Sequence, residues 1–174
     1  MSSTFRHWLP VMLLCLSLCA CGGARPSADS LRDKYVSVNL QVTGPVDIPS
    51  DDQGGLKTFT PEQLVEGKKL FESNCQNCHV GGVTTPNPKI SLNLIKLQGA
   101  TPPRDNVAAI VKFIRKPMSY DGTEEVYNCR KTDWLKDKEA ENLGAFVVRA
   151  AQRAKAWGTA RLESNQDSIT LPPK

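Results

Sequence analysis

The stretch Cys75-Gln76-Asn77-Cys78-His79 decides the fold of this 174-residue chain. Two cysteines separated by two residues and followed at once by a histidine form the attachment motif for c-type haem. Each thiol adds across a haem vinyl group, and the imidazole becomes the proximal iron ligand. Because one helical turn and its continuation bring all three bonds to the ring, the motif predicts one covalently bound haem c per chain.

Two other uses of a Cys-x-x-Cys pair fit the chain less well. A dithiol redox pair is expected within a βαβ pattern, which the sequence does not show. A zinc knuckle needs a second pair of ligands at comparable spacing. Beyond residue 24, the only other cysteine is Cys129 and there is no histidine besides His79. We therefore favour haem over both alternatives.

Residues 1–24 have the three-part layout of an export signal. Arg6 and His7 form a weakly basic start, an apolar run covers residues 9–20, and small residues follow. The run is shorter than a membrane-spanning helix. Export agrees with the haem motif, because haem is attached after translocation. The residues before Cys21 also resemble a bacterial lipobox, so a lipid anchor on Cys21 is the alternative.

Length and charge predict one domain with a mixed, solvated surface. The chain is long enough for one domain with a real core. Its 22 Lys and Arg against 18 Asp and Glu give a net charge of +4, and one of these positive charges lies in the leader. No Lys/Arg run with interleaved aromatic residues accompanies this balance. We therefore expect no nucleic-acid binding, and membrane attachment that is peripheral at most.

Residues 25–59 predict an N-terminal extension with a small β-hairpin. Apolar and polar residues alternate over 36–42, which indicates a strand. Gly, Pro and Asp residues then punctuate the chain before a possible second strand at 56–59. The alternative is a flexible tether, because an isolated two-stranded ribbon is marginally stable.

Residues 60–158 predict a mainly α-helical domain. Thr60 is a suitable N-cap, Pro61 fits the first helical position, and Gln63 completes a capping box for a helix that extends to about Asn74. The same signals predict a short helical stretch within 92–97, a helix that begins after Asp105 or Asn106 and ends at Lys116-Pro117, and a last helix from Asp137 whose apolar stripe reaches Trp157 before Gly158. Residues 159–174 read as a polar tail.

The loop after the haem motif is expected to orient the proximal histidine. Pro86 and Pro88 prevent the helix from continuing. A backbone carbonyl fixed by such a loop can accept the Nδ1 proton of His79. The sequence does not say which carbonyl is used.

The second axial ligand separates the possible function classes. Haem with one protein ligand binds and activates small molecules, whereas haem with two carries electrons. Beyond the leader there is no second histidine, so Met118 and Cys129 are the candidates. The alternative is that neither binds iron: Met118 would fill a gap in a loop, and Cys129 would be a small buried hydrophobic residue. A thiolate would lower the redox potential, whereas a thioether would raise it.

The residues around the motif resemble the cytochrome c-550 family. Gly67, Phe71 and the haem motif follow the Gly-x-x-x-Phe-x-x-x-Cys-x-x-Cys-His run of class I cytochromes c, in which the glycine lets the first and last helices cross closely. The more specific similarities are His79 to Thr84, Asn87-Pro88, Ala100-Thr101-Pro102 with Arg104, Pro117 and Tyr120-Asp121-Gly122.

This resemblance, over residues 35–157, implies a mainly α, class I cytochrome c fold with an N-terminal β-hairpin. It also implies an extrinsic haem subunit of photosystem II in the thylakoid lumen, with a low-potential, bis-histidine haem. The chain departs from the family where Cys129 stands in the neighbourhood of the expected second histidine. That departure favours Cys129 over Met118 as sixth ligand, so the chain looks like a divergent paralogue.

Two further departures leave the partner open. A polar tail replaces the family's short aromatic C-terminus, and the usual acidic surface has become slightly basic. The expected role is electron transfer or a structural haem role at photosystem II rather than enzymatic catalysis. The alternatives are a soluble carrier with another redox partner protein, or a haem sensor or peroxidase-like protein with a labile sixth ligand.

Overall fold

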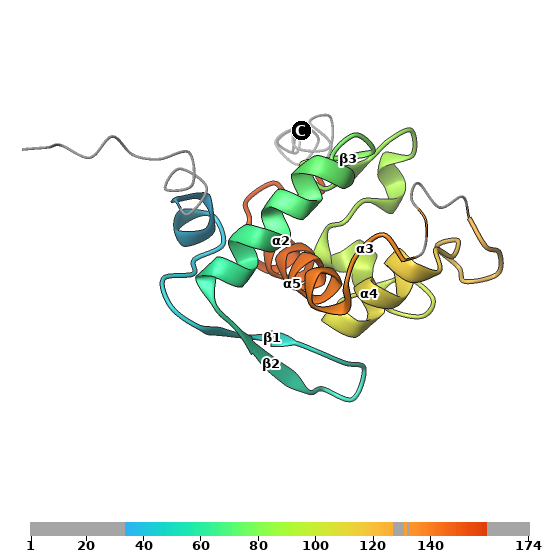
Figure 1. The fold of residues 1–174 in the computed structure, drawn as a ribbon. Coiled ribbons are helices and arrows are strands. Elements are labelled where there is room, and N and C mark those ends of the chain that lie inside the picture. The colour runs from blue at the N-terminus through green and yellow to red at the C-terminus, as the bar shows by residue number, and fades with distance from the viewer. Residues whose placement is uncertain (1–33, 127–130, 132, 160–174) are drawn as a thin grey trace, which may run out of the picture.

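Two long helices cross at the centre of the molecule, and shorter elements surround them (Figure 1). The computed structural model describes residues 34–126, 131 and 133–159. The crossing pair is α2 (Pro61–Asn74) and α5 (Asp137–Arg153). The other elements are β1 (Val46–Pro49), β2 (Leu56–Phe59), β3 (His79–Val80), β4 (Val83–Thr84), η1 (Pro88–Ile90), α3 (Leu94–Gln98) and α4 (Val107–Arg115).

The hairpin pairs β1 and β2 antiparallel, with Val46 opposite Phe59. This confirms the strand predicted at 56–59. In the turn, the Asp51 carboxylate accepts the backbone N–H groups of Gly55 and Gln53 at 2.8 and 3.0 Å. These bonds, with that of Gly55 the most important, hold the pKa of Asp51 below its usual value.

The strand predicted over 36–42 is wrong, because residues 34–38 are helical. Val36 and Leu40 are buried, but Val38 between them is 63% exposed. Burial at every fourth residue fits a helical turn, and alternation would have buried Val38 as well. Arg149 of α5 holds the following backbone by donating from Nε to the carbonyl of Leu40 at 2.9 Å.

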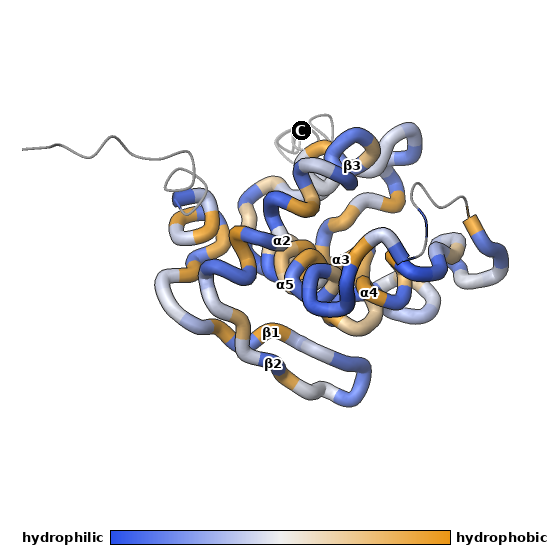
Figure 2. Tube along the Cα trace, viewed as in Figure 1, coloured by the Kyte–Doolittle hydropathy of each residue, from blue (hydrophilic) through white to orange (hydrophobic). Residues whose placement is uncertain are grey.

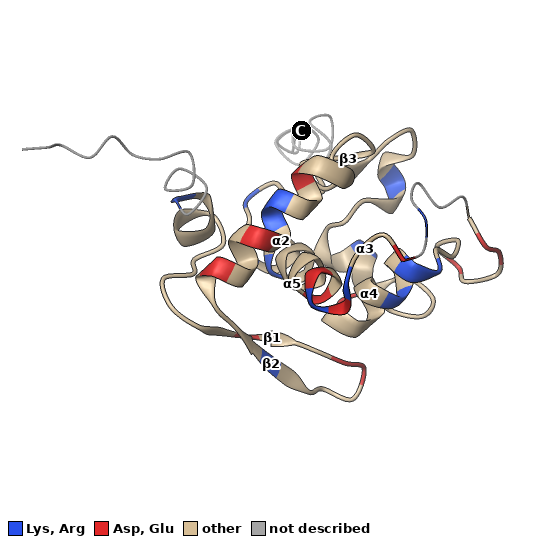
Figure 3. Cartoon of the chain, in the orientation of Figure 1, with Lys and Arg blue, Asp and Glu red and all other residues tan. Residues whose placement is uncertain are grey.

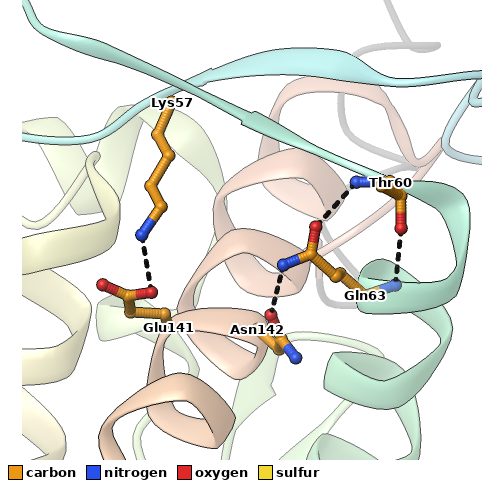
Figure 4. Close-up of polar contacts among 5 residues, drawn as sticks. All are labelled: Lys57, Thr60, Gln63, Glu141 and Asn142. Atoms are coloured by element: carbon orange, nitrogen blue, oxygen red, sulfur yellow. Dashed lines mark hydrogen bonds and ion pairs between the residues drawn. The ribbon is translucent and has the colours of Figure 1, made fainter.

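The predicted N-terminus of α2 is confirmed in detail. Thr60 donates its N–H to Gln63 Oε1 at 3.0 Å, and Gln63 returns its own N–H to Thr60 Oγ1 at 3.4 Å (Figure 4). The Gln63 side chain also donates to Asn142 Oδ1 of α5 at 3.3 Å. Asn142 is completely buried and donates to Glu66 at 2.7 Å. The cap therefore joins the two crossing helices as well.

The crossing of α2 and α5 depends on Gly67. A Cβ atom at this position would overlap the backbone carbonyl of Asn142 and the side chain of Phe146. Beside it, the rings of Phe71, Phe146 and Trp157 pack with centroids 5.2 to 5.8 Å apart. Such tilted and edge-on contacts are favourable geometries for aromatic pairs. The close approach inferred from the resemblance is therefore present.

The last helix ends earlier than the apolar stripe suggested. α5 ends at Arg153 with Ala154 as its C-cap, so Trp157 lies in the turn that follows. Its indole N–H donates to the carbonyl of Leu92 at 3.0 Å, which fastens this turn to the loop before α3. Gly158 has a φ of 69°, the left-handed conformation that glycine adopts without strain.

One hydrophobic core joins the N-terminal segment to the helices. In Figure 2 apolar (orange) segments recur along α4 and α5, and the buried residues of the helices include Leu64, Ile110 and Phe146. Within the described part of the chain, no helix has the length and apolar character needed to cross a membrane. The largest fully buried apolar side chains come from both parts of the core: Val36, Leu40, Val42, Ile48, Phe59, Leu64, Leu143, Phe146 and Val148.

Candidate functional site

A cavity of about 510 Å³ lies where the haem motif, α3 and α4 face one another. Its walls are largely apolar, and cofactor pockets commonly have this size and character. The residues of the cavity that matter chemically are Cys75, Cys78, His79, Thr84, Lys96, Arg104, Met118 and Tyr120, and the apolar walls include Ile90, Leu92, Leu97, Ile110, Phe113, Ile114, Val126 and Trp134.

The haem motif continues α2 by one turn. Cys75 is the C-cap and donates its N–H to the carbonyl of Phe71 at 2.8 Å. Cys78 and His79 then donate their N–H groups to the carbonyl of Cys75, at 3.1 and 2.9 Å. Cys75 and Cys78 are not joined in a disulfide. The structure thus brings both predicted thiols and the predicted imidazole to the same cavity.

His79 makes a hydrogen bond that the sequence did not predict. Its Nδ1 lies 3.1 Å from Thr84 Oγ1, and this hydroxyl donates to the carbonyl of Ile90 at 3.0 Å. Because the Thr84 proton goes to Ile90, Nδ1 carries the imidazole proton and Nε2 keeps its lone pair. Burial also lowers the pKa of His79, which favours the neutral, ligating form.

The expected carbonyl partner of the imidazole is therefore replaced by a hydroxyl. Thr84 pairs directly with His79 across β3 and β4, so its hydroxyl reaches Nδ1 before a loop carbonyl does. The prolines still shape the loop: η1 begins at Pro88, and Asn87 caps it. The carbonyl of Ile90 at its end is the final acceptor of the chain of bonds.

Arg104 places a half-buried positive charge at the cavity. Its guanidinium donates to the carbonyls of Met118, at 3.0 Å, and Ser119, and lies 4.5 Å from the ring centre of Phe113. Burial lowers the pKa of Arg104. No Asp or Glu is among the described residues that line the cavity. The site therefore suits a group that carries carboxylates, because a half-buried cation that no acidic residue of the cavity wall neutralises is stabilised by an anion.

The structure describes only one of the two candidates for the second axial ligand. Met118 is half-buried and lines the cavity. Cys129 lies outside the described residues. Val126 and Trp134, which bracket it in sequence, both line the cavity. The structure therefore brings Met118 to the site and leaves Cys129 as a prediction.

The residues present fit a c-type haem. Two thiols and an imidazole line one apolar cavity of suitable volume, and Arg104 would supply a positive charge for the acidic groups of the ring. From the sequence, Thr84 and Arg104 were noted only as points of similarity to the family, with no role at the site predicted for either. A hydroxyl residue shortly after the motif and an arginine in an acid-free stretch were the available signals for these two.

Comparison with known proteins gives matches over most of the chain. Residues 39–164 match the family described as the cytochrome c-550 domain. Photosystem II extrinsic protein V of Gloeobacter violaceus is 62% identical over 174 residues, covering 99% of this chain and 95% of that protein. The cytochrome c-550-like protein of Thermosynechococcus vestitus is 54% identical over 138 residues, covering 78% and 77%.

Solved structures give the same result. The crystal structure of the PsbV2 cytochrome from Thermosynechococcus elongatus has 54% sequence identity and a TM-score of 0.70, and the match covers 72% of this chain and 98% of that one. The crystal structure of cytochrome c549 has 28% identity and a TM-score of 0.57, over 61% and 90%. These matches confirm the predicted mainly α, class I cytochrome c fold.

Proposed function

The chain belongs to the cytochrome c-550 family, and from that premise we propose that it is a low-potential electron-transfer or structural haem protein at the lumenal side of photosystem II. It is a c-type cytochrome with one haem c per chain. The haem supplies the one-electron chemistry of iron. The convergence of Cys75, Cys78 and His79 on one apolar cavity carries the proposal.

In this proposal, Cys75 and Cys78 form the thioether links and His79 is the proximal ligand. Thr84 holds the Nδ1 proton of His79 and fixes the plane of the imidazole. With the proton held on Nδ1, the Nε2 lone pair would be the one left to ligate the haem iron. The apolar walls exclude water, which strengthens every charge interaction within the site.

We assign the second axial position to Cys129, with Met118 as the runner-up. No second histidine follows residue 24, so bis-histidine ligation within the chain has no candidate. Val126 and Trp134 support Cys129, because the chain on each side of it reaches the cavity. Arg130 and Lys131 follow Cys129 directly, and neighbouring cations favour a thiolate. An anionic sulfur ligand stabilises ferric iron, which accounts for the low potential proposed.

The place in the cell and the partner follow from the relatives and the leader. Three of the similar proteins bear the name photosystem II extrinsic protein V. Residues 1–24 would direct export to the thylakoid lumen, with lipidation of Cys21 as the alternative. The mature chain would then consist of the 25–59 extension, the 60–158 cytochrome domain and the 159–174 tail, peripheral to the membrane.

Electron paramagnetic resonance of the ferric protein tests the ligand assignment. We expect a low-spin signal of the thiolate type in the wild-type protein and in Met118→Leu. Cys129→Ser should replace it with a different spectrum and raise the midpoint potential. A thiolate-type signal that survives Cys129→Ser unchanged, or one that is lost in Met118→Leu, would contradict the assignment.

Co-purification tests the proposed location. A tagged copy of the protein should be found with photosystem II isolated under conditions that keep the other extrinsic subunits. A wash with high salt should release it, as expected for a protein held at the membrane surface by charge. Its absence from such preparations, while the other extrinsic subunits remain, would refute the photosystem II assignment and leave the haem ligation unaffected.

A further inference from the structure

The loop that follows the haem motif is buried at only two points. Residues 85–90 are exposed, whereas Gly82 and Ser91 on either side of them are buried. The loop cannot form an ion pair within itself, because residues 80–93 include neither Asp nor Glu. In Figure 3 the ribbon of β3 and the loop after it accordingly carry no red. The position of the loop therefore depends on packing and hydrogen bonds near its two buried points.

The turn that follows α5 contacts the loop near both of these points. The indole N–H of Trp157 donates to the carbonyl of Leu92 at 3.0 Å, and the N–H of Leu92 donates to the carbonyl of Gly82 at 2.7 Å. The Trp157 ring also covers Gly82, where an added Cβ would lie 2.7 Å from ring atom Cε2. Gly158 donates its N–H to the carbonyl of Gly81 at 2.8 Å. One buried turn thus fastens the two ends of the loop together.

This loop carries the hydrogen bonds that act on the proximal histidine. Thr84 Oγ1 lies 3.1 Å from His79 Nδ1, and the Thr84 hydroxyl donates to the carbonyl of Ile90 at 3.0 Å. The bond to Ile90 is exposed, so water competes for both groups and the bond alone contributes little to holding the loop. If the carbonyl of Ile90 moved away, the hydroxyl would lose the acceptor that keeps its proton off the imidazole. The geometry at His79 therefore requires that Ile90 be held from elsewhere.

We propose that Trp157 is a positioning residue for the proximal haem ligand. Ile90 lies two residues before Leu92, the residue that the indole holds. Trp157 thereby keeps the carbonyl of Ile90 within reach of Thr84. Thr84 then accepts the Nδ1 proton of His79, which sets the donor strength of the imidazole. The inference deepens the proposed function and rests on it, because Trp157 has this effect only if His79 ligates the iron.

The midpoint potential of Trp157→Phe tests the proposal. Phenylalanine keeps an aromatic ring in the core but has no N–H for Leu92. Redox titration of the holoprotein should give a higher midpoint potential, with the ratio of ferrous to ferric protein raised about threefold at a fixed potential, roughly 28 mV for one electron. Amide exchange at Leu92 should also accelerate, since its bond to Gly82 opens more often. An unchanged midpoint potential would overturn the proposal.

A double variant tests whether the effect passes through Thr84. Thr84→Val removes the group that accepts the Nδ1 proton, so adding Trp157→Phe should produce no further shift in midpoint potential. Additive shifts would show that Trp157 affects the haem by another route, and the proposal would then be wrong.

Two neighbouring glycines provide a matched pair of substitutions. Gly81 and Gly82 have φ values of 57° and 85°, so an alanine at either position adopts an unfavourable backbone conformation. A Cβ at Gly82 overlaps the Trp157 ring, whereas a Cβ at Gly81 has no atom within 4 Å. Gly82→Ala should raise the midpoint potential, and Gly81→Ala should leave it near that of the wild type. Equal shifts would indicate backbone strain alone and would contradict the proposal. If Gly82→Ala does not fold, Trp157→Phe still decides.

A core substitution separates positioning from general loss of stability. Val148 of α5 is completely buried and is not among the described residues that line the cavity. Val148→Ala should lower the guanidinium concentration at the midpoint of unfolding, because it removes buried methyl groups. Its redox potential should nevertheless match that of the wild type. A shift as large as that of Trp157→Phe would mean that destabilisation alone moves the potential, which is incompatible with a positioning role.

The comparison of Trp157→Phe with Thr84→Val distinguishes this inference from the proposed function. A shift in Thr84→Val without one in Trp157→Phe would remove Trp157 from the site and leave the bond between Thr84 and His79 in place. No shift in either variant would overturn both this inference and the role proposed for Thr84. The covalent attachment of haem at Cys75 and Cys78 is unaffected by either result.

Discussion

The two sides of this molecule are filled in different ways. At the crossing of α2 and α5, the chain fills its own interior: Gly67 allows backbone contact, and Asn142 is satisfied by Gln63 and Glu66. At the cavity, side chains of α3, α4 and the haem motif surround about 510 Å³ that a cofactor must fill. Protein side chains fill the helix crossing completely, whereas the cavity is a binding site for haem c.

This difference teaches where substitutions should affect stability and where they should affect the cofactor. A tightly packed crossing transmits any added volume to the backbone. Residues such as Thr84 and Arg104 act instead on a bound group. Substitutions at the crossing should therefore have larger effects on stability than substitutions at the cavity.

Gly67→Ala should give the largest loss of stability, about 3 kcal/mol in the free energy of unfolding. The added Cβ would overlap the carbonyl of Asn142, and backbone atoms cannot move aside as a side chain can. Denaturation of the holoprotein by guanidinium measures the change. Gly44→Ala is the control, because a Cβ there has no atom within 4 Å. A similar effect of both substitutions would show that the crossing is not tightly packed.

Asn142→Ala should destabilise the protein by about 2 kcal/mol. The substitution leaves Glu66 and Gln63 without the partner that ties α2 to α5, at a position with no exposure. The same denaturation measurement applies, and the ferric spectrum should stay unchanged. As a control, Thr58→Ala removes an exposed hydrogen bond to Asp47 and should cost less than about 0.5 kcal/mol. A changed ferric spectrum in Asn142→Ala would show that the helix crossing and the haem cavity are not independent.

Thr84→Val should change the cofactor with little effect on the fold. Loss of the Nδ1 acceptor makes His79 a weaker donor, which disfavours ferric iron and raises the midpoint potential. A hydrogen bond of about 1 kcal/mol corresponds to roughly 40 mV for one electron. Redox titration measures the shift. Thr84→Ser keeps the hydroxyl, and Thr85→Val changes an exposed neighbour, so both should stay near the wild-type potential.

Asp121 should give the smallest effect, limited to acid pH. Hydrogen bonds from Ser119, and then from Thr123, lower its pKa from 3.8 to about 2. A carboxylate with a lowered folded pKa stabilises the fold above its unfolded pKa, and this contribution is lost as the pH falls from about 4 towards 2. Amide exchange of residues 119–124 should therefore accelerate in this window. Asp121→Asn should remove the pH dependence, and its persistence would exclude Asp121 as the cause.

Some features could be predicted because neighbouring residues determine them. The Thr60–Gln63 capping box, the end of α2 near Asn74 and the Asn106 cap of α4 follow from local hydrogen bonding. The strand predicted over 36–42 failed, because Val36 and Leu40 suit either period and long-range burial decided between them. The end of the last helix was predicted too late for the same reason. Trp157 lies beyond the end of α5, and its burial comes from packing against the loop at Leu92.

The sequence by itself determined the covalent chemistry of this protein. Cys75, Cys78 and His79 lie within five residues, so their spacing alone predicts haem attachment, and the residue count leaves no second histidine beyond residue 24 for bis-histidine ligation within the chain. Only the tertiary structure decided that Thr84 bonds the imidazole and that Arg104 lies at the cavity. These contacts depend on how the loops fold around the site, and hydrogen bonds between segments leave no periodic signal in a sequence.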